Sequence, residues 1–394
     1  MFIRSISRVF EQRIQEKRGK IQVLIGPRQV GKSTMVSQVL EESSIPYTLA
    51  KADDVQKDDR EWIHKTWDSA RAQLRIKEES AHLLVIDEIQ KINNWSEAVK
   101  AEWDWDTQNK IELRVVLLGS SRLMIQSGLT ESLAGRFELI RMGHWTYQEM
   151  KTAFGFSLEE YIYFGGYPGA AEYIHDEKRW KRYMKDSIIT PAIEQDALQT
   201  SRIYKPSLLK QLFTLGCQYS AQELSLTKMV GQLQDAGNVT TLADYLNLLN
   251  QCQLLTGLQK YANSAVRKYN SIPKLAVYNN ALLSAWQRKN FQDVQLDPQQ
   301  WGKWIESAVG AYLISQAEEQ DYQVYYWRER NDEVDYIVVA DNECVAIEVK
   351  SGRRHMNSGL NVFAQAFHPT HSYVIGTGGI PFEDFFQMPV EQLF

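Results

Sequence analysis

The residues from Gly26 to Thr34 have the types and the spacing that bind a phosphate chain: glycine, four residues, then Gly-Lys-Ser. The glycines let the backbone wrap around phosphates and turn successive N–H groups toward them. Lys32 is expected to pair with the β- and γ-phosphates, and the Ser33 hydroxyl is expected to ligate Mg²⁺. We therefore predict a nucleotide triphosphate site that takes ATP and Mg²⁺. Its predicted binding residues are Gly26, Arg28, Gln29, Val30, Gly31, Lys32, Ser33 and Thr34.

A strand and a helix must hold this loop in place. Ile21 to Ile25 is an apolar run of strand length, and Lys32 to Leu40 carries its apolar residues at helical spacing. A helix that begins at Lys32 adds the positive end of its dipole to the site. A glycine-rich turn that matched the pattern by chance would lack this context, so the sequence favours a nucleotide site.

Two acidic residues follow another apolar run further along the chain. Leu83 to Ile86 is interpreted as a buried strand, and Asp87 and Glu88 come directly after it. A parallel strand delivers such residues to the carboxyl edge of its sheet, where ligands bind. Asp87 is predicted to hold Mg²⁺ directly or through water, and Glu88 to orient or deprotonate the attacking water. The alternative is an ordinary strand end.

Two further residues are candidates for catalysis. Ser120 follows the apolar run Leu113 to Leu118 and could hold the lytic water, or it could cap a helix. Arg136 could reach the γ-phosphate from the same or a neighbouring subunit, or it could form a surface salt bridge. The sequence leaves both alternatives open.

These motifs carry a resemblance. Together with Trp95 and the run Gly165 to Gly169, they resemble the bacterial and archaeal AAA-type ATPases that have a C-terminal domain of unknown function. The similarity covers nearly the whole chain. It implies an α/β P-loop NTPase fold with a doubly wound parallel sheet. Family members are mostly predicted ATPases without an assigned substrate, so the resemblance indicates ATPase activity and little beyond it.

Composition narrows the class of protein. The chain has 394 residues, of which 44% are apolar and 24% charged, and its net charge is −5. These values are typical of a globular protein with two or three domains, and they argue against a protein that coats nucleic acid. The longest apolar runs have strand length, and the first residues lack a continuous apolar core. We therefore expect a cytoplasmic protein without a membrane partner.

The middle of the chain predicts a winged helix. Helices are expected from Lys205 to Cys217, from Leu224 to Gln234 and from Thr241 to Cys252, followed by a strand and wing near Leu254. The last of these helices occupies the place of a recognition helix, yet it contains Asp244 and no Lys or Arg. Because it cannot neutralise phosphates, we favour a packing role over DNA reading.

Four charged residues near the C-terminus form a second candidate site. Glu306 lies on an expected helix, Asp335 on an expected strand, and Glu348 and Lys350 on one face of the next strand. This order resembles the core of PD-(D/E)XK nucleases. Asp335 and Glu348 could hold Mg²⁺ with Glu306 assisting, while Lys350 stabilises the developing charge. Arg353 and Arg354 could contact a phosphate backbone.

These observations give five expected parts. Residues 1–150 form the AAA-type P-loop ATPase domain, 151–204 a helical lid or connector, 205–262 the winged-helix-like part, 263–300 a linker, and 301–394 the nuclease-like α/β domain. The predicted function is ATP hydrolysis that drives or gates action on DNA, with a candidate Mg-dependent nuclease activity. The alternative is a nucleotide-controlled switch that engages a protein partner through a non-cleaving nuclease-like fold. Either form is compatible with an oligomer.

Overall fold

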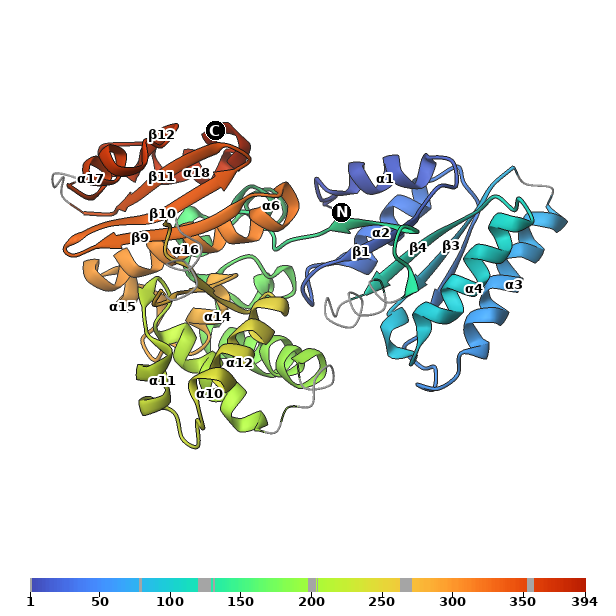
Figure 1. The fold of residues 1–394 in the computed structure, drawn as a ribbon, viewed down its shortest axis with the longest axis horizontal. Coiled ribbons are helices and arrows are strands. Elements are labelled where there is room, and N and C mark those ends of the chain that lie inside the picture. The colour runs from blue at the N-terminus through green and yellow to red at the C-terminus, as the bar shows by residue number, and fades with distance from the viewer. Residues whose placement is uncertain are drawn as a thin grey trace. The chain divides into compact units, whose positions relative to one another are not determined.

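The chain forms two compact units, residues 1–142 and 143–394. The computed structural model describes residues 2–77, 80–119, 129, 132–197, 203, 205–262, 271–352 and 358–394. Each unit is described by itself below (Figure 1). No helix in these ranges combines the length and apolar character that a membrane crossing requires. The domain limits expected from the sequence stay predictions.

The first unit is built on a five-stranded parallel sheet in the order β2-β3-β4-β1-β5. Its strands are β1 Ile21–Ile25, β2 Tyr47–Lys51, β3 His82–Asp87, β4 Leu113–Gly119 and β5 Phe137–Arg141. Its helices are α1 Ser7–Gln15, α2 Lys32–Glu42, α3 Glu61–Ile76 and α4 Trp95–Gln108. Helix α1 packs on α2, and α3 packs on α4 (Figure 1). This is the α/β fold of P-loop NTPases that the sequence predicts.

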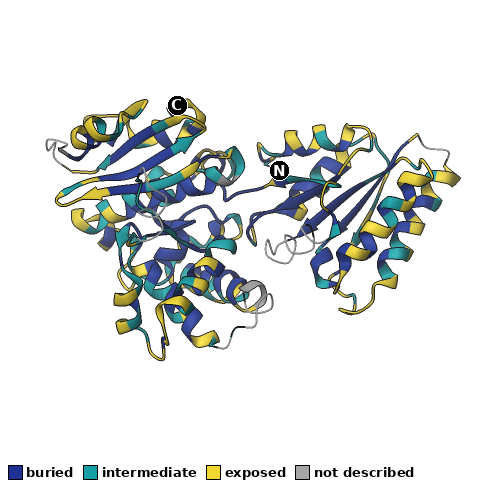
Figure 2. Cartoon of the chain, in the orientation of Figure 1, coloured by how far each residue is buried: buried dark blue, intermediate teal, exposed yellow. Residues whose placement is uncertain are grey.

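The burial of the strands explains their composition. Every residue of β1 and of β3 is buried, whereas residues of the edge strand β2 alternate between exposed and half-buried. Figure 2 shows the sheet as a dark layer between helices whose outer sides are exposed. Interior parallel strands are covered on both faces, so their sequences are continuous apolar runs. Their carboxyl ends all meet at one edge of the sheet.

The second unit begins with short helices and then forms a small antiparallel sheet. The helices are α6 Tyr147–Phe154, α7 Leu158–Phe164, α8 Glu177–Tyr183, α10 Pro206–Gln218, α11 Leu226–Gln232 and α12 Val239–Gln251. The strands are β6 Gln222–Glu223, β7 Leu255–Leu258 and β8 Lys274–Val277, in the order β6-β8-β7. Helices α10, α11 and α12, together with this three-stranded sheet, agree with the predicted winged-helix middle.

The described part of the expected linker at residues 263–300, which is 271–300, contains a strand and short helices. Strand β8 is the central strand of the small sheet and pairs with both β6 and β7. Two short helices, α14 Asn280–Ser284 and α15 Phe291–Gln295, follow it. The prediction missed β8 because a four-residue strand is identified by its pairing partners rather than by a long sequence pattern.

The rest of the second unit is a helix, a mixed sheet and two further helices. These elements are α16 Pro298–Gln320, β9 Gln323–Glu329, β10 Asp332–Ala340, β11 Glu343–Lys350, α17 Ser358–Phe367, β12 His371–Gly376 and α18 Phe382–Gln387. The sheet order is β12-β11-β10-β9, with β9, β10 and β11 antiparallel and β12 parallel to β11. The pairing of β10 with β9 shifts its register between Val334 and Ile337, at Asp335 and Tyr336.

Candidate functional site

The phosphate loop joins β1 to α2, and two of its positions require glycine for different structural reasons. Gly31 has φ 87° and lies directly before α2, so it occupies the left-handed region that favours glycine. Gly26 is needed for a different reason, since a Cβ there would overlap the carbonyl oxygen of Met142. The chain therefore turns sharply at the carboxyl end of β1 and starts a helix whose N–H groups face the turn.

The two nucleotide motifs meet at this edge of the sheet. The Ser33 hydroxyl, in the first turn of α2, donates a hydrogen bond of 2.7 Å to Asp87 Oδ2, at the end of β3. Lys32 is buried, and its Nζ donates to the carbonyl oxygens of Gly26 at 3.0 Å and Pro27 at 2.7 Å. Ser33 and Asp87 are 54 residues apart in the sequence, and strand β4 lies between β1 and β3. The two side chains meet because the parallel sheet brings the carboxyl ends of β1 and β3 to the same edge.

Glu88 is held next to Asp87 by a tight turn. Its φ is 55°, and its N–H donates to Asp87 Oδ1 at 2.9 Å. The Gln90 side chain is buried and donates from Nε2 to Glu88 Oε2 at 2.6 Å. Gln90 therefore positions the carboxylate expected to act on water. No role was predicted for Gln90, although it stands two residues after Glu88 and could have been found from that spacing.

This set of residues fits ATP and Mg²⁺. A hydroxyl and a carboxylate oxygen 2.7 Å apart are the hard oxygen ligands that Mg²⁺ prefers. The Lys32 ammonium is hydrogen-bonded to two carbonyl oxygens of the loop. Phosphate oxygens of a bound nucleotide would take the place of these carbonyls as its partners. The loop and the two motifs thus converge, whereas the predicted Ser120 lies outside the described residues.

Arg136 lies at the opposite edge of the sheet. Its carbonyl accepts from Ile21 N at 2.8 Å, at the amino end of β1, while the phosphate loop follows the carboxyl end. The length of a five-residue strand, roughly 16 Å, separates the two edges. Its guanidinium binds both carboxylate oxygens of Asp104, at 2.8 and 3.0 Å, and this contact lowers the pKa of Asp104. The structure therefore does not bring Arg136 to the phosphate loop of its own chain, and its catalytic role, in the same or a neighbouring copy, stays a prediction.

The structure also brings together the charged residues of the C-terminal part. Asp335 on β10 faces β11, and its Oδ2 accepts from Val349 N at 2.7 Å. Lys350 Nζ pairs with Glu348 Oε1. Burial raises the pKa of Glu348 to about 7, and the nearby Asp335 acts in the same direction. The predicted acidic cluster on β10 and β11 therefore exists and is largely buried.

Lys274, for which the sequence predicted no role, completes this cluster. It comes from β8, and its Nζ lies 2.6 Å from Glu306 Oε1 and 3.7 Å from Asp335 Oδ1. The same Nζ donates to the Asp335 carbonyl at 3.2 Å and lies 4.6 Å from the centre of the Tyr336 ring. Only 8% of the Lys274 side chain is exposed. The carboxylates of Glu306 and Asp335 therefore share a protein cation.

The expected metal site at Asp335 and Glu348 does not fit this geometry. Within the described ranges, no three His, Cys, Asp or Glu side chains are arranged to hold a metal ion. Asp335 is taken by a backbone N–H and by Lys274, and Glu348 Oε1 is taken by Lys350. Of these carboxylate oxygens, Glu348 Oε2 alone is buried without a hydrogen-bond partner among the described residues. Arg353 and Arg354 lie outside those residues.

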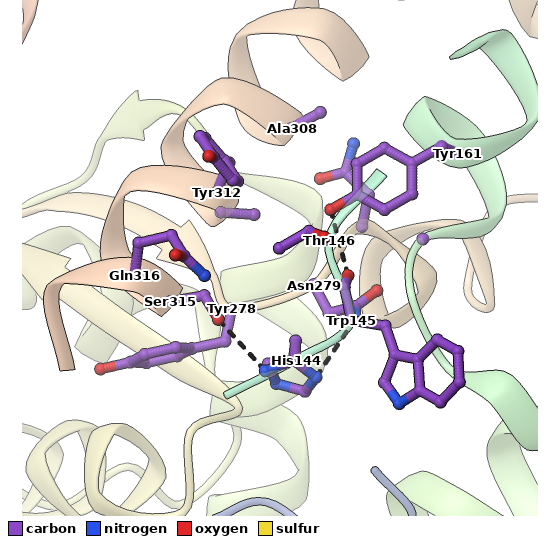
Figure 3. Close-up of a pocket in the computed structure, with 13 residues that line it drawn as sticks. His144, Trp145, Thr146, Tyr161, Tyr278, Asn279, Ala308, Tyr312, Ser315 and Gln316 are labelled. Atoms are coloured by element: carbon purple, nitrogen blue, oxygen red, sulfur yellow. Dashed lines mark hydrogen bonds between the residues drawn. The ribbon is translucent and has the colours of Figure 1, made fainter. Parts of the chain in front are cut away.

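Gly165, the first residue of the run from Gly165 to Gly169, lines a pocket in the second unit. A Cβ at Gly165 would overlap Asn279 Oδ1, and that oxygen accepts from Gly166 N and Ala281 N, both at 3.1 Å. Figure 3 shows Asn279 directed toward His144, whose Nδ1 lies 3.3 Å from Asn279 Nδ2. No Asp, Glu, Lys or Arg is among the described residues that line the pocket. The run is therefore part of a packed junction rather than of an acid–base site.

Comparison with family models divides the chain into three parts. Residues 18–151 match the AAA domain. Residues 155–295 and residues 301–393 each match a domain of unknown function.

Relatives and solved structures give a similar picture. Two uncharacterised proteins, from Mycobacterium bovis and Mycobacterium tuberculosis, are each 24% identical over 358 residues, which cover 87% of this chain and 74% of the relative. The Walker-type ATPase of Pyrococcus abyssi has a similar fold, with a TM-score of 0.51 at 14% identity over 72% of this chain and 95% of that one. Residues 18–151 therefore match an AAA domain and have the fold of a P-loop ATPase, and the two regions that follow match domains of unknown function.

Proposed function

We propose that the first unit hydrolyses ATP at the edge of its sheet where β1 and β3 end. The observation that carries this proposal is the 2.7 Å hydrogen bond between the Ser33 hydroxyl and Asp87. It joins the residue that follows the phosphate-loop lysine to the acidic end of β3, which is the arrangement P-loop NTPases need for Mg²⁺ and phosphate. The match of residues 18–151 to the AAA domain supports the same function.

Each side chain then has a separate task. Lys32 leaves the carbonyls of Gly26 and Pro27 and pairs with the β- and γ-phosphates. Ser33 and Asp87 would hold Mg²⁺, which would screen the negative charge of the phosphates. Glu88, oriented by Gln90, holds the attacking water and accepts its proton.

Glu88→Gln tests this assignment. The variant keeps the shape of the side chain but loses the base, so we expect it to bind ATP normally and to hydrolyse it at least roughly 100-fold more slowly. Binding is measured with a fluorescent ATP analogue and turnover by phosphate release. Glu97→Gln is the matched control, because Glu97 lies on the same unit with 65% of its side chain exposed. Wild-type turnover in Glu88→Gln would refute the role of Glu88.

The nucleotide cycle has two candidate uses, action on DNA and engagement of a protein partner. Helix α12, in the position of a recognition helix, contains Asp244 and no Lys or Arg. The carboxylates expected to cut DNA are instead paired with Lys274, Lys350 and a backbone N–H. These observations favour a nucleotide-controlled switch with a non-cleaving C-terminal part. DNA action and nuclease activity stay predictions from the sequence.

A single assay separates the two uses. Mg²⁺-dependent ATP hydrolysis is measured with and without DNA, and the same samples are examined for DNA cleavage. The switch predicts turnover that does not respond to DNA and no cleavage in Mg²⁺ or Mn²⁺. Stimulation by DNA, with nicking that disappears in Glu348→Ala, would contradict the switch and establish a DNA enzyme.

A further inference from the structure

The carboxylate cluster of the second unit contains two cations of its own. Glu306, Asp335 and Glu348 supply the negative charges, and Lys274 and Lys350 supply the positive ones. Lys350 is expected from the order of strands, since it shares a strand face with Glu348. Lys274 is different because it comes from another sheet.

The position of Lys274 is fixed by the backbone around it. Its strand, β8, is hydrogen-bonded on both sides, to β6 and to β7. The chain after β7 also pairs with β9: Tyr261 N donates to Tyr326 O at 2.7 Å, and Tyr326 N donates to Gln259 O at 3.2 Å. Tyr326 further bonds the carbonyl of Ile272, two residues before Lys274. The backbone of Lys274 is therefore held in place by sheet pairing, and its ammonium is held by Glu306 and Asp335.

A divalent metal and this ammonium would compete for the same oxygens. Mg²⁺ and Mn²⁺ need several oxygen ligands in a compact shell, and they are repelled by a nearby positive charge. The Lys274 Nζ already lies 2.6 Å from Glu306 and 3.7 Å from Asp335. With Asp335 Oδ2 bound to Val349 N, few carboxylate oxygens are left for a metal.

We propose that Lys274 is the resident cation of this cluster, that it excludes divalent metal from Asp335 and its neighbours, and that it ties the β6-β8-β7 sheet to the C-terminal sheet. The cluster is thus an internal ion bridge in the place where a nuclease-like fold would hold metal. This proposal does not depend on ATP hydrolysis, and its readout is separate from the assays of the first unit.

Metal binding by full-length variants tests the proposal. Mn²⁺ is the probe, titrated without nucleotide and followed by the electron paramagnetic resonance of the free ion. All proteins carry Asp87→Asn, which removes the acidic ligand of the ATPase site. The variants added to this parent are Asp335→Asn, Lys274→Met, Lys274→Met with Asp335→Asn, and Lys289→Met. The last is the matched control, because Lys289 pairs with Asp297 at the surface, with 48% of its side chain exposed.

The proposal predicts a gain of binding. Lys274→Met should bind one more Mn²⁺ per chain than the parent, and Asp335→Asn should abolish that extra site. The parent and Lys289→Met should show no site that depends on Asp335. If Lys274→Met does not fold, Lys274→Met with Glu306→Gln removes one charge of each sign, keeps Asp335 and Glu348, and should show the same gain.

Two results would overturn the proposal. An Mn²⁺ site in the parent that disappears with Asp335→Asn would mean that metal binds with Lys274 in place. A folded Lys274 variant without any gain would mean that Lys274 is not what excludes the metal. Loss of ATP turnover in Glu97→Gln or normal turnover in Glu88→Gln would concern the ATPase proposal alone.

Discussion

Gly165→Ala is expected to destabilise the second unit strongly. Gly165 ends α7 with φ +69° and ψ −162°, a backbone region essentially restricted to glycine, which costs an L side chain roughly 1–3 kcal/mol. The new Cβ would also overlap Asn279 Oδ1 and lie 2.6 Å from Ala281 N, and such overpacking costs roughly 1–3 kcal/mol. Alanine also lowers the conformational entropy of the unfolded chain, which stabilises the folded state by about 0.4–1 kcal/mol. The net loss is about 3 kcal/mol.

Gly155→Ala is a control for a positive φ without a close contact. Gly155 ends α6 with φ +73° and ψ +23°, in the left-handed helical region, and no atom beyond its chain neighbours lies within 4 Å of a Cβ built there. Its cost is therefore the backbone term alone, about 1 kcal/mol or less after the entropy gain. The difference between the two variants therefore reports the contact with Asn279 together with the more restricted backbone conformation of Gly165.

The assay is thermal and urea unfolding of the full chain, with each variant compared with the wild type. For a unit of this size, 1 kcal/mol corresponds to roughly 2–4 °C, so Gly165→Ala should lower Tm by roughly 6–12 °C and Gly155→Ala by less than about 4 °C. Equal shifts for the two variants would refute the packing explanation of the run from Gly165 to Gly169. Such a result would reopen a functional role for that run.

Two further predictions follow from charged groups. Arg136→Ala should leave ATP turnover of the monomeric chain unchanged and reduce stability by no more than about 1 kcal/mol, because the side chains of Arg136 and Asp104 are 32% and 36% exposed and solvent screens their ion pair. A loss of turnover in the isolated chain would contradict the placement of Arg136 at the far edge of the sheet. Glu348 should make stability fall as pH rises. Its pKa in the folded chain is raised to about 7, so the folded state binds the proton more tightly than the unfolded state does, and this contribution is lost between about pH 4.5 and 7. Urea unfolding at pH 5 and pH 8 should therefore show Glu348→Gln gaining stability relative to wild type at the higher pH, by at most about 3 kcal/mol; a pH-independent difference would contradict the raised pKa.

The nucleotide site could be predicted from the sequence because local patterns define it. Ser33 belongs to the pattern of glycine, four residues and Gly-Lys-Ser, which is specific to phosphate loops. Asp87 directly follows a continuous apolar run, which is typical of a buried strand in a parallel sheet. The edge of the sheet on which Arg136 lies could also have been inferred. A residue that precedes a strand of a parallel sheet lies at the amino edge, away from the carboxyl ends where ligands bind.

The C-terminal cluster could be predicted only in part. Asp335, Glu348 and Lys350 belong to neighbouring strands, so the alternation of side chains places them together. Lys274 is 32 residues before Glu306 and 61 before Asp335, and it reaches them only because two separate sheets pack against each other. Long-range packing of this kind leaves no periodic pattern in the sequence, and the four residues of β8 are too few to reveal their partners.

The ion pair between Lys274 and Glu306 joins two regions of the chain that match different family models. Lys274 belongs to the region at residues 155–295, and Glu306 belongs to the region at residues 301–393, which match different family models. A fragment that starts near residue 300 would keep the buried carboxylates and lose their counter-ion, together with the strand that pairs with β9. The last region should therefore be insoluble or unfolded when produced alone. An exchange of that region between relatives would succeed only where the lysine and the glutamate are inherited together.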